Sequence, residues 1–530
     1  MKALTWQGTE KVTIEEVPDP RIEEPTDAII RVTSTAICGS DLHLYKVLGP
    51  YLRPGDILGH EPMGIVEEVG SEAAGRLKVG DRVVVPFNIS CGHCWMCTHD
   101  LQSQCETTAD HSQDKGAALF GYTSMYGAVP GGQAEYLRVP QAQYGPIVVP
   151  EDGPDERYLY LSDILPTAWQ AVRYAGVEKG STVAVVGLGP VGQLAARAAL
   201  HLGAERVIGI DLVADRLATA ARHGVETIDA RDVDGEVTDV VREMTGGRGA
   251  DASIEAVGME AHGNPIAEQV IGLAGKLPGP LARKAVDKAG IDRLDALLTA
   301  IGSARRGGTV SISGVYGGAA DPLPMMDMFD RQLTLRMGQA NVKRWTDDLL
   351  RIITEEGDVF GLEDLATDRP ALSEAPAYYE KFQKKQDGCL KVAAVEGRGH
   401  DDVVVDRPQC VVGEALVVVA DLLGRQRDRV QVHPRVVEGF GRLARFTRPS
   451  DPGAVPSAHH RVHRGDETPW ASLPLGAVLP LASVDRQSIG RDDEVVGRPV
   501  VAHRCQLLLA SRSDCPHRRR GLRDGGGRPG

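Results

Sequence analysis

A strand, a glycine-rich turn and a helix follow one another between residues 182 and 204, and this order constrains the fold more than any other feature. The apolar run TVAVVG leads into GLGPVGQ and then into PVGQLAARAALHLGA, and the pair RVIGID and VADRLATAARHG repeats the pattern. Such alternation is typical of a parallel sheet whose strands are joined by helices. We therefore expect an α/β fold with a doubly wound parallel sheet.

The turn itself predicts a binding site for a dinucleotide. The residues of the turn that we assign to this site are Gly187, Gly189, Pro190, Val191 and Gly192. Glycines allow the tight turn and let a pyrophosphate approach the N-terminus of the helix. Asp211 ends the next strand, where a carboxylate can accept the ribose 2′-hydroxyl, and Leu212 and Val213 follow it instead of an arginine for a 2′-phosphate. We therefore expect NAD rather than NADP.

The length and charge of the chain suggest its other parts and exclude some partners. A chain of 530 residues has room for several domains. Residues 1 to about 150 carry short Val/Ile runs broken by Gly, Pro and Asp, which predict a barrel-like β domain. Residues 1–400 hold 57 acidic and 39 basic residues, a balance that disfavours nucleic-acid binding. Since the N-terminus lacks an apolar signal core and no apolar run is long enough for a membrane helix, we expect a cytoplasmic protein.

Four of the nine cysteines crowd into one short loop. They have the spacing C-x2-C-x2-C-x7-C and are Cys91, Cys94, Cys97 and Cys105. Four thiolates give the closed tetrahedral shell of a structural Zn²⁺. An iron–sulfur cluster or disulfide bonds are the alternatives, but a reducing compartment disfavours disulfides.

A second group of metal-binding residue types lies upstream, in the strings ICGSDLH and GHEPMG. These strings contain Cys38, Ser40, His43, His60 and Glu61. A thiolate and an imidazole suit a second Zn²⁺, and a catalytic site would need one more protein ligand and an open position. Taken alone, Cys38 and His60 are more often ordinary core residues. The presence of the other motifs in the same chain favours the metal site.

Together these motifs identify a resemblance to a known family. The string GHEPMGIVEEVGSEA resembles the signature of zinc-containing alcohol dehydrogenases of the medium-chain dehydrogenase/reductase superfamily, and the cysteine quartet and GLGPVG follow in that family's order. The resemblance covers residues 1 to about 395. It implies a GroES-like catalytic domain with both zinc sites over 1–165, a Rossmann domain over 166–325, and a return of the chain to the catalytic domain over 326–395.

Within this family, three segments resemble the formaldehyde dehydrogenase branch. They are YLSDILPTAWQA, FGYTSMYGAVPGGQAEYLRVP and an extra stretch after residue 258. The resemblance makes Asp163 the third ligand of the catalytic zinc beside Cys38 and His60, although an aspartate here could equally cap a helix. It implies that Ser40 takes the proton of the alcohol and that His43 relays it to solvent. It also places Glu61 near the metal and Thr167 against the nicotinamide.

These assignments predict an oxidoreductase that carries two Zn²⁺ per chain. We expect it to transfer a hydride from an alcohol or a hydrated aldehyde to NAD. One alternative is a glutathione-independent formaldehyde dehydrogenase or aldehyde dismutase that retains its NAD. Another is a redox sensor that binds NAD and zinc without turnover. By resemblance we further expect a homo-oligomer, in particular a tetramer.

The segment 396–530 differs from the rest of the chain. Within it, residues 401–530 hold 20 basic residues that are all Arg, and they contain no Lys, Asn, Tyr or Met. A module for nucleic acid or an acidic partner, and a metal-binding extension using Cys410, Cys505 and Cys515, are two interpretations of it. We favour a third, namely sequence that is not selected to fold and stays disordered.

Overall fold

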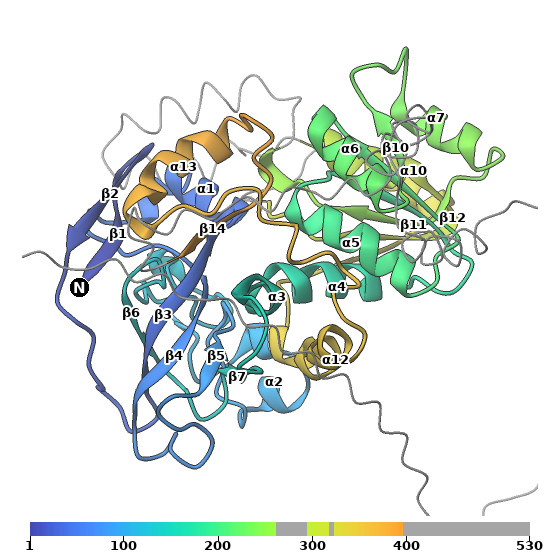
Figure 1. Ribbon diagram of the computed structural model, residues 1–530. Coiled ribbons are helices and arrows are strands. Elements are labelled where there is room, and N and C mark those ends of the chain that lie inside the picture. Colours follow the sequence, from blue (N-terminus) through green and yellow to red (C-terminus); the bar gives the residue numbers. More distant parts are fainter. Residues whose placement is uncertain (261–293, 317–322, 396–530) are drawn as a thin grey trace, which may run out of the picture. The chain divides into compact units, whose positions relative to one another are not determined.

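Two sheets organise the residues that the computed structural model describes, namely 1–260, 294–316 and 323–395 (Figure 1). The expected tail, 396–530, lies outside the described residues, as does most of the extra stretch after residue 258. One sheet is parallel and the other is antiparallel, so the two predicted β regions form separate sheets.

The parallel sheet has six strands in the order β10-β9-β8-β11-β12-β13, and every pair in it is parallel. Its strands are β8 (Thr182–Val186), β9 (Arg206–Asp211), β10 (Glu226–Asp229), β11 (Ala250–Glu255), β12 (Ala304–Ile312) and β13 (Thr334–Met337). The strand order reverses between β8 and β11, which is the point where doubly wound sheets bind their ligands. This sheet confirms the predicted α/β fold.

Helices connect these strands and cover the sheet. They are α5 (Pro190–His201), α6 (Ala214–Arg222), α7 (Val237–Met244), α10 (Asp295–Ser303) and α11 (Met325–Asp330). Helix α5 contacts β8, β9 and β11, while α10 contacts β8, β11 and β12. Pro190 occupies the first turn of α5, where its missing N–H costs no hydrogen bond.

The antiparallel sheet is built from both ends of the described chain. Its strands are β3 (Ala28–Ile37), β4 (Glu61–Val69), β5 (Arg82–Val84), β6 (Tyr136–Val139), β7 (Ile147–Val148) and β14 (Val392–Val395), beside the separate hairpin of β1 (Lys2–Gly8) and β2 (Lys11–Glu16). Strand β14 pairs with β3, with Val392 opposite Ile37. The last described strand therefore lies in the N-terminal sheet.

The remaining described α-helices precede the parallel sheet along the chain or follow it. They are α1 (Gly39–Lys46), α2 (Trp95–Thr98), α3 (Asp155–Leu159), α4 (Ile164–Tyr174), α12 (Val342–Glu355) and α13 (Ala375–Gln383). Helix α4 contacts α5, α12, β12 and β13, and it buries Leu165, Ala168, Trp169 and Val172. These residues share one hydrophobic core with residues of both sheets. Because β13 lies beyond residue 325 and still pairs with β12, the parallel sheet extends past the boundary expected from the sequence.

Candidate functional site

Three side chains predicted to bind one metal ion come together where β3 ends and β4 begins. Cys38 precedes α1, His60 precedes β4, and Asp163 precedes α4. The Sγ atom of Cys38 lies 3.5 Å from Oδ2 of Asp163, and Nε2 of His60 lies 3.2 Å from the same oxygen. Together with Glu61 they form the Cys38 cluster, in which one ligand atom of each buried residue lies within 4.8 Å of the others. A thiolate, an imidazole and a carboxylate are ligands that zinc accepts, so these residues fit the metal.

A further carboxylate, that of Asp41, holds two of these side chains in place. Its Oδ1 lies 3.0 Å from Nδ1 of His60, and its Oδ2 accepts a hydrogen bond of 2.9 Å from the backbone N–H of Cys38. Because Asp41 engages Nδ1, the other ring nitrogen of His60 faces Cys38 and Asp163. Asp41 is not among the residues predicted from the sequence, although it stands in the string ICGSDLH, three residues after Cys38.

The Cys38 cluster concentrates negative charge in a buried place. Burial, and then the charges of Glu61 and Asp163, raise the pKa of the Cys38 thiol to about 11. Burial also acts to raise the pKa of Asp163, but hydrogen bonding and the charge of His60 outweigh it and lower that pKa overall. A divalent cation at this position would reverse the effect on Cys38, because a coordinating thiol loses its proton.

One member of the cluster, Glu61, forms a buried ion pair. The Nζ atom of Lys391 lies 2.5 Å from Oε2 of Glu61, and both side chains are fully buried. The second carboxylate oxygen of Glu61, Oε1, is buried and has no hydrogen-bond partner among the described residues. A buried oxygen without a partner costs free energy of folding unless a ligand binds it. This agrees with the predicted place of Glu61 near a metal. Lys391 is not among the residues predicted from the sequence; its signal is a lysine inside the apolar run GCLKVAAV.

A cavity of about 1000 Å³ adjoins the cluster and the glycine-rich turn. Predicted site residues in its lining are Cys38, Ser40, His43, Gly187, Gly189, Pro190, Val191 and Asp211. At Gly187, where φ is +90°, a Cβ would lie 2.4 Å from the side chain of Val257. Gly192 packs closely against the backbone of the turn, since a Cβ there would lie 1.8 Å from the carbonyl oxygen of Gly187. The turn therefore needs glycine at both positions, and the cavity fits a ligand of dinucleotide size.

Asp211 is held by the backbone at the C-terminal end of β9. Its Oδ2 accepts a hydrogen bond of 2.6 Å from Leu188, and its Oδ1 accepts hydrogen bonds from the N–H groups of Leu212 and Val213. The structure adds one cation that the sequence analysis missed. Helix α6 brings Arg216 to the cavity, with Nη1 4.0 Å from Oδ2 of Asp211.

The other predicted catalytic residues lie in two places. Ser40 and His43 line the cavity, and Oγ of Ser40 lies 3.9 Å from Sγ of Cys38. Thr167 is not part of the cavity lining; its hydroxyl donates a hydrogen bond of 2.7 Å to Oδ1 of Asp163. The two residues are one helical turn apart on α4, which brings the hydroxyl to the carboxylate. This placement gives Thr167 a role in orienting Asp163.

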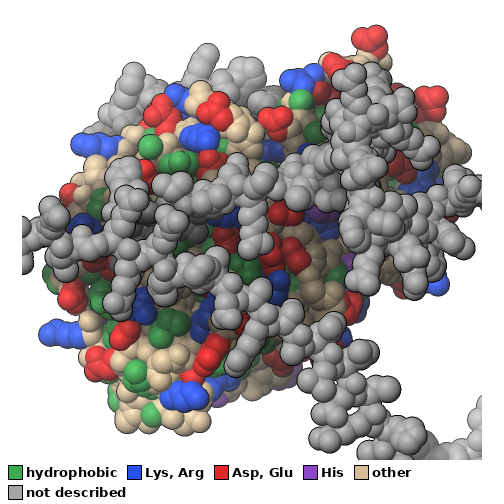
Figure 2. Space-filling model, viewed as in Figure 1, with side chains coloured by type: hydrophobic (Ala, Val, Ile, Leu, Met, Phe, Trp, Pro, Cys, Tyr) green, Lys and Arg blue, Asp and Glu red, His purple; other side chains and the backbone are tan. Residues whose placement is uncertain are grey.

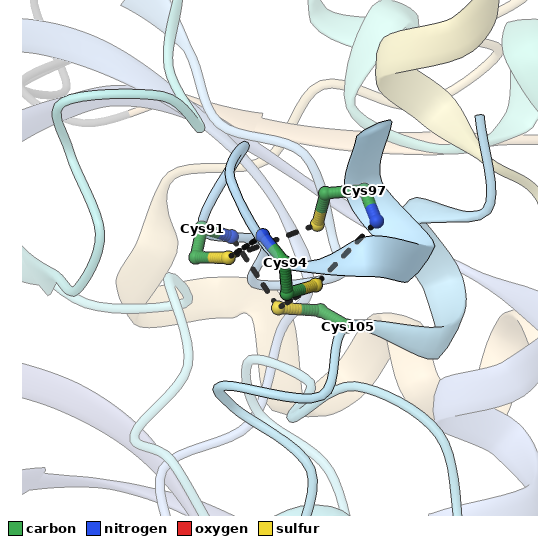
Figure 3. A group of neighbouring side chains, drawn as sticks. All are labelled: Cys91, Cys94, Cys97 and Cys105. Atoms are coloured by element: carbon green, nitrogen blue, oxygen red, sulfur yellow. Dashed lines mark hydrogen bonds between the residues drawn. The ribbon is translucent and has the colours of Figure 1, made fainter. Parts of the chain in front are cut away.

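The four clustered cysteines point their sulfur atoms toward one another (Figure 3). The Sγ atoms of Cys91 and Cys97 lie 4.0 Å apart, and those of Cys94 and Cys105 lie 3.9 Å apart. A tetrahedral zinc with bonds of about 2.3 Å would place its sulfurs about 3.8 Å apart, so the geometry fits this metal. Described cysteines form no disulfide bond. We call residues 91–105 the cysteine lobe.

The backbone of the cysteine lobe also favours thiolates. Sγ of Cys91 accepts hydrogen bonds from the backbone N–H groups of His93 and Cys94 and from the hydroxyl of Thr107. The thiols of Cys94 and Cys105 each accept one more from a backbone N–H. Donors aimed at sulfur stabilise its charged form, which is the form that binds a metal.

The visible surface of the described residues mixes the two charge signs. Figure 2 shows Asp and Glu side chains interspersed with those of Lys and Arg over the face that is not covered by grey atoms. Among the described helices, none is both long and apolar enough to cross a membrane.

Comparisons with known proteins agree with these observations. The family described as alcohol dehydrogenase GroES-like domain matches residues 24–150, and that described as zinc-binding dehydrogenase matches residues 190–270. An uncharacterised zinc-type alcohol dehydrogenase-like protein of Bacillus subtilis is 42% identical over 401 residues, which are 74% of this chain and 99% of the relative. Formaldehyde dismutase of Pseudomonas putida is 32% identical over 410 residues, covering 72% of this chain and 95% of the relative. Among solved structures, an alcohol dehydrogenase from Thermus sp. ATN1 matches with a TM-score of 0.63 and 34% identity, over 74% of this chain and 99% of that protein.

Proposed function

This chain belongs to the zinc-type alcohol dehydrogenase family of oxidoreductases, and we propose on that premise that it transfers a hydride from an alcohol or a hydrated aldehyde to NAD. One observation carries the proposal. Cys38 belongs both to the buried group of metal-binding side chains and to the lining of the cavity that the glycine-rich turn borders. A metal ion and a dinucleotide would therefore be neighbours.

Within this site the residues have distinct tasks. Cys38, His60 and Asp163 would hold the catalytic Zn²⁺, and Asp41 fixes the ring of His60. When bound, Zn²⁺ and NAD supply Lewis acidity and a hydride acceptor, respectively. The chain's own part is to exclude water from the Cys38 cluster, to hold the reacting groups in line and to remove a proton.

The proton leaves by way of two side chains of α1. Ser40 lines the cavity, and its hydroxyl oxygen lies near Sγ of Cys38, where it can accept the proton of the substrate. His43 follows one turn later on the same helix and also lines the cavity. The order of the two residues on one helix supports a relay from the substrate to Ser40 and then to His43.

A panel of substrates tests the proposed reaction. Short alcohols and formaldehyde, each with and without glutathione, are offered to the purified full chain with NAD, and NADH is followed by its absorbance. We expect turnover with at least one substrate that does not need glutathione. A protein that holds two zinc ions and binds NAD but turns over none of them would instead support the redox-sensor alternative.

Aldehyde dismutation is a second candidate, and the similarity to formaldehyde dismutase favours it. Dismutation requires that NAD stay bound through both half-reactions. We expect a dismutase to retain NAD during gel filtration, so that the supernatant of the denatured protein absorbs as a nucleotide. Freely exchanging NAD would leave alcohol oxidation as the function.

Asp211 sets the preference for NAD in this proposal. Replacing Asp211→Gly removes the carboxylate that would accept the ribose 2′-hydroxyl and leaves Arg216 in the cavity lining to pair with a 2′-phosphate. We expect the ratio of kcat/KM for NAD over that for NADP to fall by roughly 100-fold or more, since the change removes a charge that repels the 2′-phosphate and leaves Arg216 to attract it. Steady-state kinetics with both cofactors measure it. The control Asp215→Gly, on α6, should leave the ratio near its original value.

An exposed apolar surface supports the expected self-association. Phe329 is 82% exposed and Met326 is 79% exposed on α11, and Met337 is 63% exposed on β13. Strand β13 is also an edge of the parallel sheet within the described residues. A second copy of the same strand, running antiparallel across a two-fold axis, would match its free backbone groups. We propose that copies of this chain pair through this surface; a tetramer would need a second interface.

The variant Phe329→Asp tests this pairing. A charge on this apolar surface should halve the mass measured by light scattering after gel filtration, because each copy would contribute one buried carboxylate. Val359→Asp, at an exposed apolar residue elsewhere, is the matched control. An unchanged mass for Phe329→Asp would place the interface on another surface.

A further inference from the structure

One buried amide, that of Gln170, fastens helix α4 to the segment that precedes α12. Its side chain is 3% exposed. The Oε1 atom of Gln170 accepts hydrogen bonds from the backbone N–H of Asn341 at 3.0 Å, from its Nδ2 at 3.3 Å and from Nε1 of Trp345 at 3.1 Å. The Nε2 atom donates to the carbonyl oxygens of Gly338 and Gln339. A single side chain thus makes four hydrogen bonds to residues 338–341 and one to Trp345 within α12.

Asn341 continues this connection to the cysteine lobe. Its Oδ1 accepts two hydrogen bonds from Ser103, one from the backbone N–H at 3.0 Å and one from the hydroxyl at 2.9 Å. Both side chains are nearly fully buried. Ser103 stands two residues before Cys105, in the short helical turn that leads to this cysteine. The cysteine lobe is therefore joined to α4 by two polar side chains in series.

The other end of the connection reaches the Cys38 cluster. Asp163 immediately precedes α4, and Thr167 and Gln170 follow it on that helix. The hydroxyl of Thr167 holds Oδ1 of Asp163, so the carboxylate moves with the helix. A shift of α4 would displace the one ligand of the Cys38 cluster that this helix carries.

Hydrogen bonds restrict the position of α4 relative to the segment before α12 more tightly than apolar packing would. Buried amides lose free energy whenever one of their hydrogen bonds is unmade, so a satisfied chain of them permits one relative position of its elements. Asn88, which lies three residues before Cys91, adds a hydrogen bond of 2.6 Å from its Nδ2 to the carbonyl oxygen of Ala340. The segment before α12 is thereby held from both sides.

We propose that Ser103, Asn341 and Gln170 are positioning residues through which the cysteine lobe sets the place of α4, and with it the metal affinity of the Cys38 cluster. This inference rests on the proposed function, because it requires that the Cys38 cluster bind a metal ion. None of the three residues belongs to either group of metal-binding side chains.

The test measures metal binding directly, in addition to turnover. Zinc is removed from the Cys38 cluster of the full chain with a weak chelator, and Co²⁺ is titrated in; its absorption distinguishes a site with one thiolate from one with four. The variants are Ser103→Ala, Asn341→Ala, Gln170→Met, which keeps the volume without the hydrogen bonds, and the double variant Ser103→Ala/Gln170→Met. Thr346→Ala is the control, since this buried hydroxyl of α12 bonds only within its own helix.

We expect each single variant to raise the dissociation constant of Co²⁺ by roughly 2- to 30-fold and to alter the Co²⁺ spectrum. The effects of Ser103→Ala and Gln170→Met should not add, because both interrupt one bridge. Thr346→Ala should leave affinity and spectrum unchanged.

Two results would overturn the inference in different ways. If the unchanged protein binds Co²⁺ at the Cys38 cluster and all variants bind it equally well, the bridge does not position Asp163. If the unchanged protein fails to bind Co²⁺ there, the proposed function fails and the inference falls with it. Ser103→Ala removes a single hydroxyl and leaves the backbone bond of that residue, so it keeps the test decisive even if a larger change impairs folding.

Discussion

Replacing Asp163→Ala is expected to lower kcat/KM for alcohol oxidation by roughly 1000-fold or more. The change removes one of three protein ligands and leaves His60 and Cys38 without the carboxylate oxygen that both contact. Lewis acidity contributes several kcal/mol to transition-state stabilisation in such sites, and each ~1.4 kcal/mol is a factor of ten in rate. Steady-state kinetics and the zinc content per chain measure the two effects together.

The glycine-rich turn contains none of the three ligands. A measurement of NAD binding therefore distinguishes a loss of activity caused by the missing ligand from one caused by unfolding. We expect the dissociation constant of NAD, measured by calorimetry, to change by no more than about threefold, because Asp211 and the turn are untouched. The exposed carboxylate of Asp152 offers a matched control, Asp152→Ala, which should keep full activity. Full activity of the Asp163→Ala protein would show that the reaction does not depend on this ligand.

Replacing Cys97→Ser is expected to reduce the zinc content from two to one per chain and to lower Tm by roughly 10 °C. Structural zinc contributes folding free energy directly, and a loss of roughly 10 kcal/mol produces a shift of this order in a unit of about 400 residues, whose unfolding entropy is about 2.1 cal/mol/K per residue. The thiol of Cys97 is buried and faces Cys91, so a serine there leaves the cysteine lobe with three sulfur ligands.

Cys389 provides the control for that experiment. It is equally buried, but it is not part of either group of metal-binding side chains. The Cys389→Ala protein should keep two zinc ions and lose less stability, since it lacks the packing of one sulfur atom and the hydrogen bonds of that thiol with Asp368 and Thr367, but no metal ion. Metal analysis by mass spectrometry and a thermal melt give both quantities. Retention of two zinc ions after Cys97→Ser would exclude the cysteine lobe as a four-thiolate site.

Features that depend on local sequence could be predicted. The parallel sheet follows from the alternation of apolar strands and amphipathic helices. The cysteine quartet could be predicted because its four residues lie within a loop of 15. In so short a loop the sulfur atoms are close to one another. Gly187 and Gly192 follow from the turn that they must form. In each case the interacting groups are near neighbours along the chain.

Features that depend on distant contacts could not be predicted from pattern alone. Asp163 is 103 residues from its contact His60, and only a family resemblance pointed to it. Lys391 lies 330 residues from Glu61, and its pattern was that of an ordinary closing strand. Arg216 reached the cavity because α6 turns back toward the end of β9. Long-range pairing of this kind is decided by how elements pack, which no local period encodes.

The pairing of β14 with β3 also limits when this protein can acquire its site during synthesis. Val392 must be made before it can lie opposite Ile37, so the N-terminal sheet stays open at one edge until almost 400 residues have left the ribosome. Loops closed over such a distance are costly in entropy and form slowly. Until that strand arrives, Glu61 lacks Lys391, and the exposed edge of β3 can pair with another chain. Refolding yield should therefore depend strongly on protein concentration, because pairing within the chain competes with pairing between chains.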